Sequence, residues 1–244
     1  MATLDVSTRL DEFLTPGIPP GGGRPHKRTT ASQMLQDSLR HRIVTLALVP
    51  GTALSRAEIA EAYGVSQTPV RDAMMKLEEE GLLFVYPQSK TVVSKIDIGH
   101  AKETQFLRLS LELEVTRQLT RQSDKTDLTI PRRILAAQKE ALERDETLGR
   151  FGALDRLFHQ SLCEMMGVSN LWLLISARSG HIDRLRALNL PDPGKPRSIL
   201  EYHEGILDAI GGGDLPLVDR MVREHLSGTL ASVDQIRERY PDYF

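Results

Sequence analysis

The 244-residue sequence predicts a mainly α-helical protein with an N-terminal winged helix-turn-helix and a C-terminal antiparallel bundle of six or seven helices. Its length exceeds that of a usual single domain, and a hydrophobic content of 40% suffices for two cores. Three short helical patterns and two β-rich runs occupy the chain up to about residue 96. From His100 onward the strand signals vanish, and amphipathic helical patterns separated by breakers follow one another.

Four segments are expected along the chain. Residues 15–25 hold too much proline and glycine for a helix or a strand interior, so residues 1–28 are predicted to be a flexible arm. Residues 29–96 form the winged helix-turn-helix, residues 97–236 form the helical domain, and residues 237–244 form a C-terminal tail.

The first two helices of the N-terminal domain are indicated by apolar spacing and by caps. The first begins at Ala31 and is expected to continue until Pro50 and Gly51 end it. The second covers residues 55–63, with Ser55 as N-cap in a capping box.

The third helix and a hairpin complete this domain. The helix begins with Ser66 as N-cap, carries Pro69 in its first turn and ends at Gly81. Two β-rich runs, at 83–86 and 91–94, flank a polar tip. This order of elements is that of a winged helix-turn-helix.

A winged helix-turn-helix indicates DNA binding, because the third helix enters the major groove and its first residues meet base edges and phosphates. A serine-rich helix start alone is more often only a cap. Residues 24–96 carry 10 Lys/Arg and 7 Asp/Glu, whereas residues 97–244 carry 20 and 23. This contrast favours a polyanionic partner, although an ordinary solvated surface gives similar values. The predicted DNA contacts are Ser66, Gln67, Thr68, Arg71 and, on the wing, Lys90.

Composition also restricts the cellular setting. The sequence has no run of about 18 uncharged apolar residues and no basic stretch leading into an apolar core, so a membrane partner and export are not expected. Cys163 is the only cysteine, which excludes an internal disulfide and predicts a packing role in a helix. A cytoplasmic protein is expected.

Three predicted helices of the second domain place polar side chains beside or within their apolar stripes. One histidine on such a face is most often a core residue bonded to a carbonyl. Three histidines and an aspartate are costly to bury without partners, and a divalent metal ion is an economical common partner. The residues alone leave both interpretations open. The candidate ligands are Asp155, His159, His203 and His225.

The segment PGTALSRAEIAEAYGVSQTPVRDAMMKLEEEGLL resembles the DNA-binding domain of the GntR superfamily of bacterial transcription regulators, and the resemblance covers roughly residues 32–96. Two positions differ from the usual pattern. Gln67 stands where the family usually has arginine, and the wing tip PQSK lacks the usual glycine. Both differences bear on which operator sequence is bound.

The spacing Asp155-x3-His159 and the segments EYHEGILDAI and VREHL resemble the FCD domain, the effector-binding domain of the FadR branch, over about residues 98–232. The resemblance implies that the four candidate ligands bind a divalent transition metal, zinc first, with nickel and manganese as alternatives. A small organic acid is expected at the open metal positions. Arg108 matches the arginine that such domains direct at the effector, although it can instead pair with Glu112 on its own helix. Asn170, His181 and Arg184 are further candidates for effector contacts.

The expected protein is a homodimeric regulator, a repressor rather than an enzyme, that binds an inverted-repeat operator in double-stranded DNA. Two alternatives remain: a regulator for which the metal itself is the signal, and a metal-dependent hydrolase. The segment HEGIL lacks the second histidine of HExxH, which counts against one familiar type of hydrolase.

Overall fold

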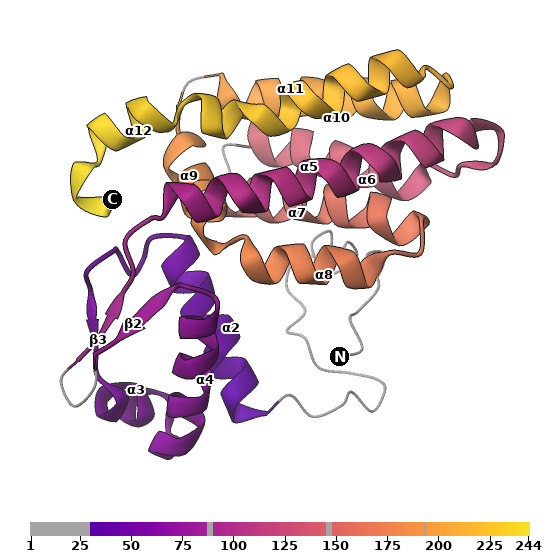
Figure 1. Ribbon diagram of the computed structural model, residues 1–244. Coiled ribbons are helices and arrows are strands. Elements are labelled where there is room, and N and C mark those ends of the chain that lie inside the picture. Colours follow the sequence, from indigo (N-terminus) through magenta and orange to yellow (C-terminus); the bar gives the residue numbers. More distant parts are fainter. Residues whose placement is uncertain (1–29, 87–89, 145–147, 193) are drawn as a thin grey trace. The chain divides into compact units, whose positions relative to one another are not determined.

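The structure of the protein is a computed structural model, and it is mainly helical as predicted (Figure 1). No described helix combines the length and the apolar composition that spanning a membrane requires. The predicted arm at 1–28 and the centre of the wing tip lie outside the described residues. The structure describes residues 30–86, 90–144, 148–192 and 194–244.

The elements follow one another in the predicted order of short helices, hairpin and long helices. The first group comprises α2 (Ala31–Val44), β1 (Ala53–Leu54), α3 (Arg56–Tyr63), α4 (Gln67–Glu79), β2 (Leu83–Val85) and β3 (Thr91–Val93). The second comprises α5 (Ile98–Arg121), α6 (Thr129–Glu143), α7 (Leu148–Met165), α8 (Ser169–Arg178), α9 (Gly180–Asn189), α10 (Lys195–Gly211), α11 (Leu215–Ala231) and α12 (Val233–Arg239). Two short 3-10 helices lie at Ser123–Lys125 and Pro241–Tyr243.

The chain divides into two compact units that are discontinuous in sequence. One unit, here called the winged-helix unit, contains the described residues up to Thr104 together with Ser176–Asn189 and Thr229–Phe244. The other, here called the bundle unit, contains Gln105–Ile175 and Leu190–Gly228. The domain boundaries given above for the sequence remain predictions.

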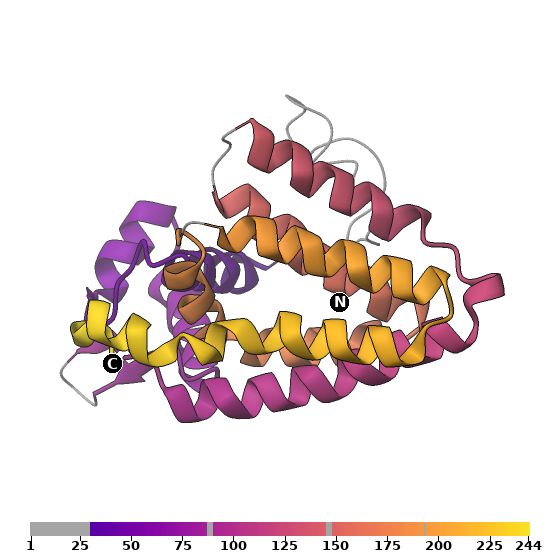
Figure 2. The same cartoon turned by 90° about the horizontal axis from the view of Figure 1, so that it is seen from above.

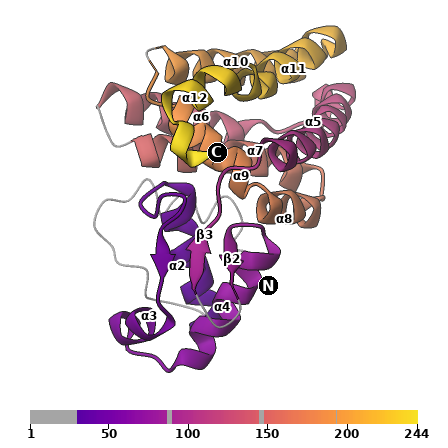
Figure 3. The same ribbon diagram turned by 60° about the vertical axis from the view of Figure 1, so that its left-hand side comes forward.

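The core of the winged-helix unit lies between α2, α3, α4 and a small sheet (Figure 3). Leu39, Ile43, Val70 and Leu77 are fully buried there. The sheet is antiparallel with the order β1-β3-β2, and Val92 pairs with Ala53 on one side and Phe84 on the other. The hairpin is therefore confirmed. The two-residue strand β1 was not predicted, because so short a segment shows no alternation of apolar and polar residues.

One predicted helix end is wrong, and one predicted N-cap lacks its side-chain hydrogen bond. The first helix ends at Val44, before the proline and glycine expected to stop it, because Leu46 takes a left-handed conformation with φ of 61°. Ser66 does precede α4, but its side chain accepts no hydrogen bond from the helix. Ser55, in contrast, accepts from the backbone N–H of Glu58 at 3.3 Å, as the predicted cap requires.

Helix α9 and the C-terminal segment belong to the winged-helix unit because they bond to the backbone that follows β3. Arg184 is fully buried and donates to the carbonyl of Ser94 at 2.6 Å. The N–H of Ile96 donates to the carbonyl of Tyr243 at 2.7 Å, and Lys95 donates to that of Phe244 at 2.6 Å. These bonds fix residues 94–96 from two sides.

The bundle unit contains most of α5, α8 and α11 and the whole of α6, α7 and α10, so six described helices form it, within the predicted number. Figure 2 shows α10 between α6 and α11. Phe151, Leu154, Phe158 and Leu162 form the predicted apolar stripe of α7, and all four are buried in the core. Cys163 is also fully buried there, which confirms its packing role.

Candidate functional site

The N-terminal end of α4 presents polar side chains to solvent. Ser66, Gln67, Thr68 and Arg71 are all exposed, and so is Lys90 at the start of the returning wing strand. The free N–H groups at a helix N-terminus attract anions. The five predicted DNA contacts are therefore all accessible, as contact with DNA requires.

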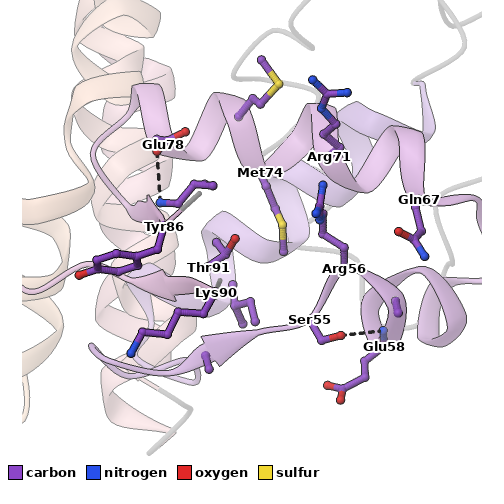
Figure 4. A pocket seen from close by; sticks show the side chains of 15 residues that line it. Ser55, Arg56, Glu58, Gln67, Arg71, Met74, Glu78, Tyr86, Lys90 and Thr91 are labelled. Carbon is purple, nitrogen blue, oxygen red and sulfur yellow. Dashed lines mark hydrogen bonds between the residues drawn. The ribbon is translucent and has the colours of Figure 1, made fainter. Parts of the chain in front are cut away.

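A groove of about 850 Å³ lies between the start of α3, α4 and the wing (Figure 4). Its charged lining consists of Arg56, Arg71 and Lys90 with Glu58 and Glu78. The carboxylate of Glu78 accepts the N–H of Val85 at 3.2 Å, so a wing strand already engages one of the two acids. Three cationic side chains against two acidic ones leave the groove with a net positive charge, which suits a phosphate backbone.

The bundle unit brings the four predicted metal ligands together. Asp155 and His159 come from α7, His203 from α10 and His225 from α11. One potential ligand atom from each side chain lies within 4.8 Å of all the others. His159 and His203 are at most 1% exposed, and His203 stacks on the ring of Phe158 with the centroids 3.8 Å apart. Three packed helices thus fix the position of the cluster.

Hydrogen bonds set the tautomers of two of the imidazoles. The Nδ1 atom of His159 lies 2.6 Å from a carboxylate oxygen of Glu112, and Nδ1 of His203 lies 2.9 Å from the amide oxygen of Gln138. Both partner atoms are acceptors, so each Nδ1 carries a proton, and in the neutral ring Nε2 presents a lone pair. The two Nε2 atoms lie 3.1 and 3.2 Å from Nε2 of His225. Two lone pairs therefore converge on one atom.

The cluster has more acceptors than its own protons can satisfy. His225 offers at most one proton at Nε2 to two lone pairs. The Oδ1 atom of Asp155 lies 3.5 Å from Nε2 of His203 and 3.9 Å from Nε2 of His159, and no described group hydrogen-bonds to it. Imidazole nitrogens and a carboxylate oxygen that face one another in this way fit the ligand set of a divalent transition metal ion.

Burial keeps two of the imidazoles in the form that binds metal. It lowers the pKa of His203 and that of His225 well below the ordinary value of 6.5, and the neighbouring histidines add to the shift. Burial is the largest single influence on Glu112 and raises its pKa, but the charges and hydrogen bonds of Arg108 and His159 together outweigh burial and lower the pKa to about 2. Glu112 is thus a carboxylate, which strengthens the ligand that it holds.

The predicted effector residues belong to two different units of the chain. Arg108 is buried, pairs with Glu112 through Nε and lies over Trp172 at 5.5 Å from the ring centroid. Asn170 is exposed near the start of α8. His181 and Arg184 belong to the winged-helix unit.

His181 forms hydrogen bonds within its own unit. Its Nδ1 accepts the N–H of Asp97 and a guanidinium N–H of Arg184, each at 2.9 Å. The structure therefore brings Arg108 to the histidine cluster through Glu112, and engages His181 and Arg184 in fixing the segment after β3.

Sequence analysis missed the roles of Glu112 and Gln138 beside the imidazoles. Gln138 is fully buried on the face of α6 that also carries Ile134, Leu135 and Ala141. A glutamine inside an apolar stripe is a visible signal, because a buried amide requires partners. Glu112 was considered only as a partner of Arg108, and periodicity does not show that it faces α7.

Comparison with known proteins agrees with this arrangement. The model of bacterial regulatory proteins of the gntR family matches residues 31–93, and that of the FCD domain matches residues 103–228. An HTH-type transcriptional regulator in an unstable DNA locus of Streptomyces ambofaciens is 36% identical over 84% of this chain and 86% of its own length. The HTH-type transcriptional repressor RspR of Escherichia coli is 32% identical over 87% of this chain and 93% of its own length.

Solved structures share the fold. Escherichia coli McbR/YncC has a TM-score of 0.71 at 22% identity and covers 86% of this chain and 99% of its own. A GntR transcriptional regulator from Rhodococcus has a TM-score of 0.69 at 20% identity, with 86% and 98% covered. With its GntR helix-turn-helix domain, its FCD domain and relatives named as transcriptional regulators, the chain belongs to the GntR family of bacterial transcription regulators.

Proposed function

We propose that this regulator is a repressor that binds operator DNA through the groove beside α4 and releases it when a small carboxylate binds at a metal site in the FCD domain. The observation that carries the metal site is the convergence of three imidazole Nε2 atoms and an Asp155 oxygen. Asp155, His159, His203 and His225 would hold the ion. The metal would supply open coordination positions for carboxylate and hydroxyl oxygens.

Arg108 supports a carboxylate as the effector. Its guanidinium pairs with Glu112, and Glu112 in turn contacts His159. Only the Glu112 side chain therefore separates this positive charge from one of the proposed metal ligands. An incoming carboxylate would be attracted by both the metal ion and this guanidinium. A neutral ligand of the same size would gain neither interaction.

The operator is proposed to be an inverted repeat bound by a homodimer. One winged helix contacts only a few base pairs, and two related by a twofold axis require two half-sites of opposite orientation. One relative, RspR, is named a repressor, which supports the same sign of control in this chain.

The test is to titrate hydroxy acids and sugar acids against the protein bound to a duplex that it has selected from a random-sequence pool. Release is expected with some acids and only in zinc-loaded protein, typically through 1–3 kcal/mol of coupling between the two ligands. Release by zinc alone would instead make the metal the signal. Equal binding of an acid to chelator-treated protein would contradict the proposed role of the metal.

A further inference from the structure

We propose that Arg56 is a DNA-contacting residue whose guanidinium binds a backbone phosphate of the strand that lies in the groove beside α4. The inference rests on the proposed DNA-binding function of that groove. Arg56 is the first residue of α3 and lines the groove together with Arg71 and Lys90. Arg56 belongs to neither the third helix nor the wing, and the DNA contacts predicted from the sequence lie only on those two elements.

The local structure determines where Arg56 points. Ser55 caps α3 by accepting the N–H of Glu58, and this cap fixes the first turn and hence the backbone of Arg56. Figure 4 shows the Arg56 side chain extending from the start of α3 toward α4, on the side where Arg71 lies. The guanidinium is therefore presented to the groove rather than to the protein core.

No ion pair among the described residues holds the side chain of Arg56 in its position. Arg40, in the same unit, pairs with Glu80 at 2.8 Å and donates to the carbonyl of Ser176 at 2.7 Å. Within the described part of the chain, neither Arg56 nor Arg71 forms an ion pair. A cation that is exposed to a groove and unpaired can bind an anion without first breaking a contact.

The charge balance of the groove favours a phosphate as the ligand. Gln67, at the start of α4, is uncharged, so Arg71 is the guanidinium that α4 contributes to the lining of the groove. Arg56 contributes a second guanidinium from α3. In helix-turn-helix proteins the helix before the recognition helix crosses the DNA backbone, and α3 is that helix here. A base contact by Arg56 is the competing outcome that the experiment separates.

The experiment compares wild-type protein with Arg56→Gln by fluorescence anisotropy on two duplexes, one selected by the protein from a random pool and one of mixed sequence. Arg42→Gln is the matched control, since Arg42 is also an exposed arginine of the winged-helix unit but does not line the groove. One lost phosphate contact reduces the slope of log K against log salt by about 0.9. Arg56→Gln should then bind about eight-fold more weakly at about 0.1 M salt on both duplexes, with the difference vanishing near 1 M.

Neutral methylphosphonates placed singly along the selected duplex identify the contacted phosphate. One substitution should weaken wild-type protein and Arg42→Gln but leave Arg56→Gln unaffected. Unchanged affinity and salt slope in Arg56→Gln, with thermal unfolding like that of wild type, would overturn the proposal. So would weakening on the selected duplex alone with an unchanged slope, which would indicate a base contact. If wild-type protein enriches no duplex from the pool and does not bind the mixed-sequence duplex, it is the DNA-binding function of the groove that fails.

Discussion

Replacing Gln138 by leucine should weaken metal binding without unfolding the bundle. The amide oxygen of Gln138 accepts the Nδ1 proton of His203 at 2.9 Å, and both side chains are fully buried. A metal ion on Nε2 forces the proton to remain on Nδ1, where leucine offers no acceptor. Without metal, the ring can move the proton to Nε2 and face the lone pairs of its neighbours. Loss of this hydrogen bond therefore destabilises mainly the metal-bound state.

The magnitude follows from the cost of one unsatisfied buried donor. That cost is about 1–3 kcal/mol, which corresponds to a decrease in metal affinity of roughly 5- to 150-fold. Metal-free stability should change little, because the substitution also removes the Gln138 amide nitrogen, which is buried without a hydrogen-bond partner among the described residues. Gln138→Glu keeps an acceptor at this position and should retain the affinity of wild type for metal.

Zinc affinity is measured by competition with a chelator of known affinity, and metal-free stability by urea unfolding in excess chelator. The reasoning would be refuted if Gln138→Leu bound zinc as tightly as wild type. It would be refuted equally if Gln138→Glu lost affinity as strongly as Gln138→Leu, because the acceptor would then not be what matters.

Three further predictions concern the winged-helix unit. Arg71→Ala should weaken operator binding by about 1–3 kcal/mol at matched salt, whereas Arg42→Ala should not; equal affinities would place α4 outside the major groove. Burial lowers the pKa of His181 from 6.5 to about 4. As the pH falls, this histidine is therefore protonated in the unfolded chain before it is protonated in the folded protein. Folding stability should decrease as the pH falls from about 6.5 to about 4. Urea midpoints across that range should show a smaller decrease in His181→Gln than in wild type, and identical decreases would contradict the assignment. Gly180→Ala should cost about 1–3 kcal/mol in thermal unfolding, because its Cβ would lie 2.5 Å from the Leu82 side chain; an unchanged Tm would contradict the close approach.

The sequence was sufficient to predict the elements whose signals are local. Helical spacing and the Ser55 cap indicate α3, and the apolar stripe of α7 places His159 beside the core. The four candidate metal ligands could therefore be named from three such stripes. The positive φ of Leu46 has no such signal, because leucine is not a residue that favours a left-handed conformation. The first helix was therefore predicted too long.

Contacts between distant segments were the part that the sequence did not show. Nothing in the spacing of α6 indicates that Gln138 faces an imidazole of α10, 65 residues away. His181 was named as a possible effector contact, but the sequence did not show that it accepts the N–H of Asp97 or that its helix packs with the segment after β3. Periodicity shows which face of a helix is buried, but it does not show against which segment.

The most direct measurement of the central claim is the metal content of protein purified without chelator, determined by elemental analysis together with its thermal unfolding. The account predicts about one divalent transition metal ion per chain in wild type and in His41→Ala, whose histidine is exposed on α2. His203→Ala should lose the metal and the added stability, which amounts to about 2.7 kcal/mol when free metal is 100-fold above Kd. Wild-type protein without transition metal, or His203→Ala with a full complement, would contradict it.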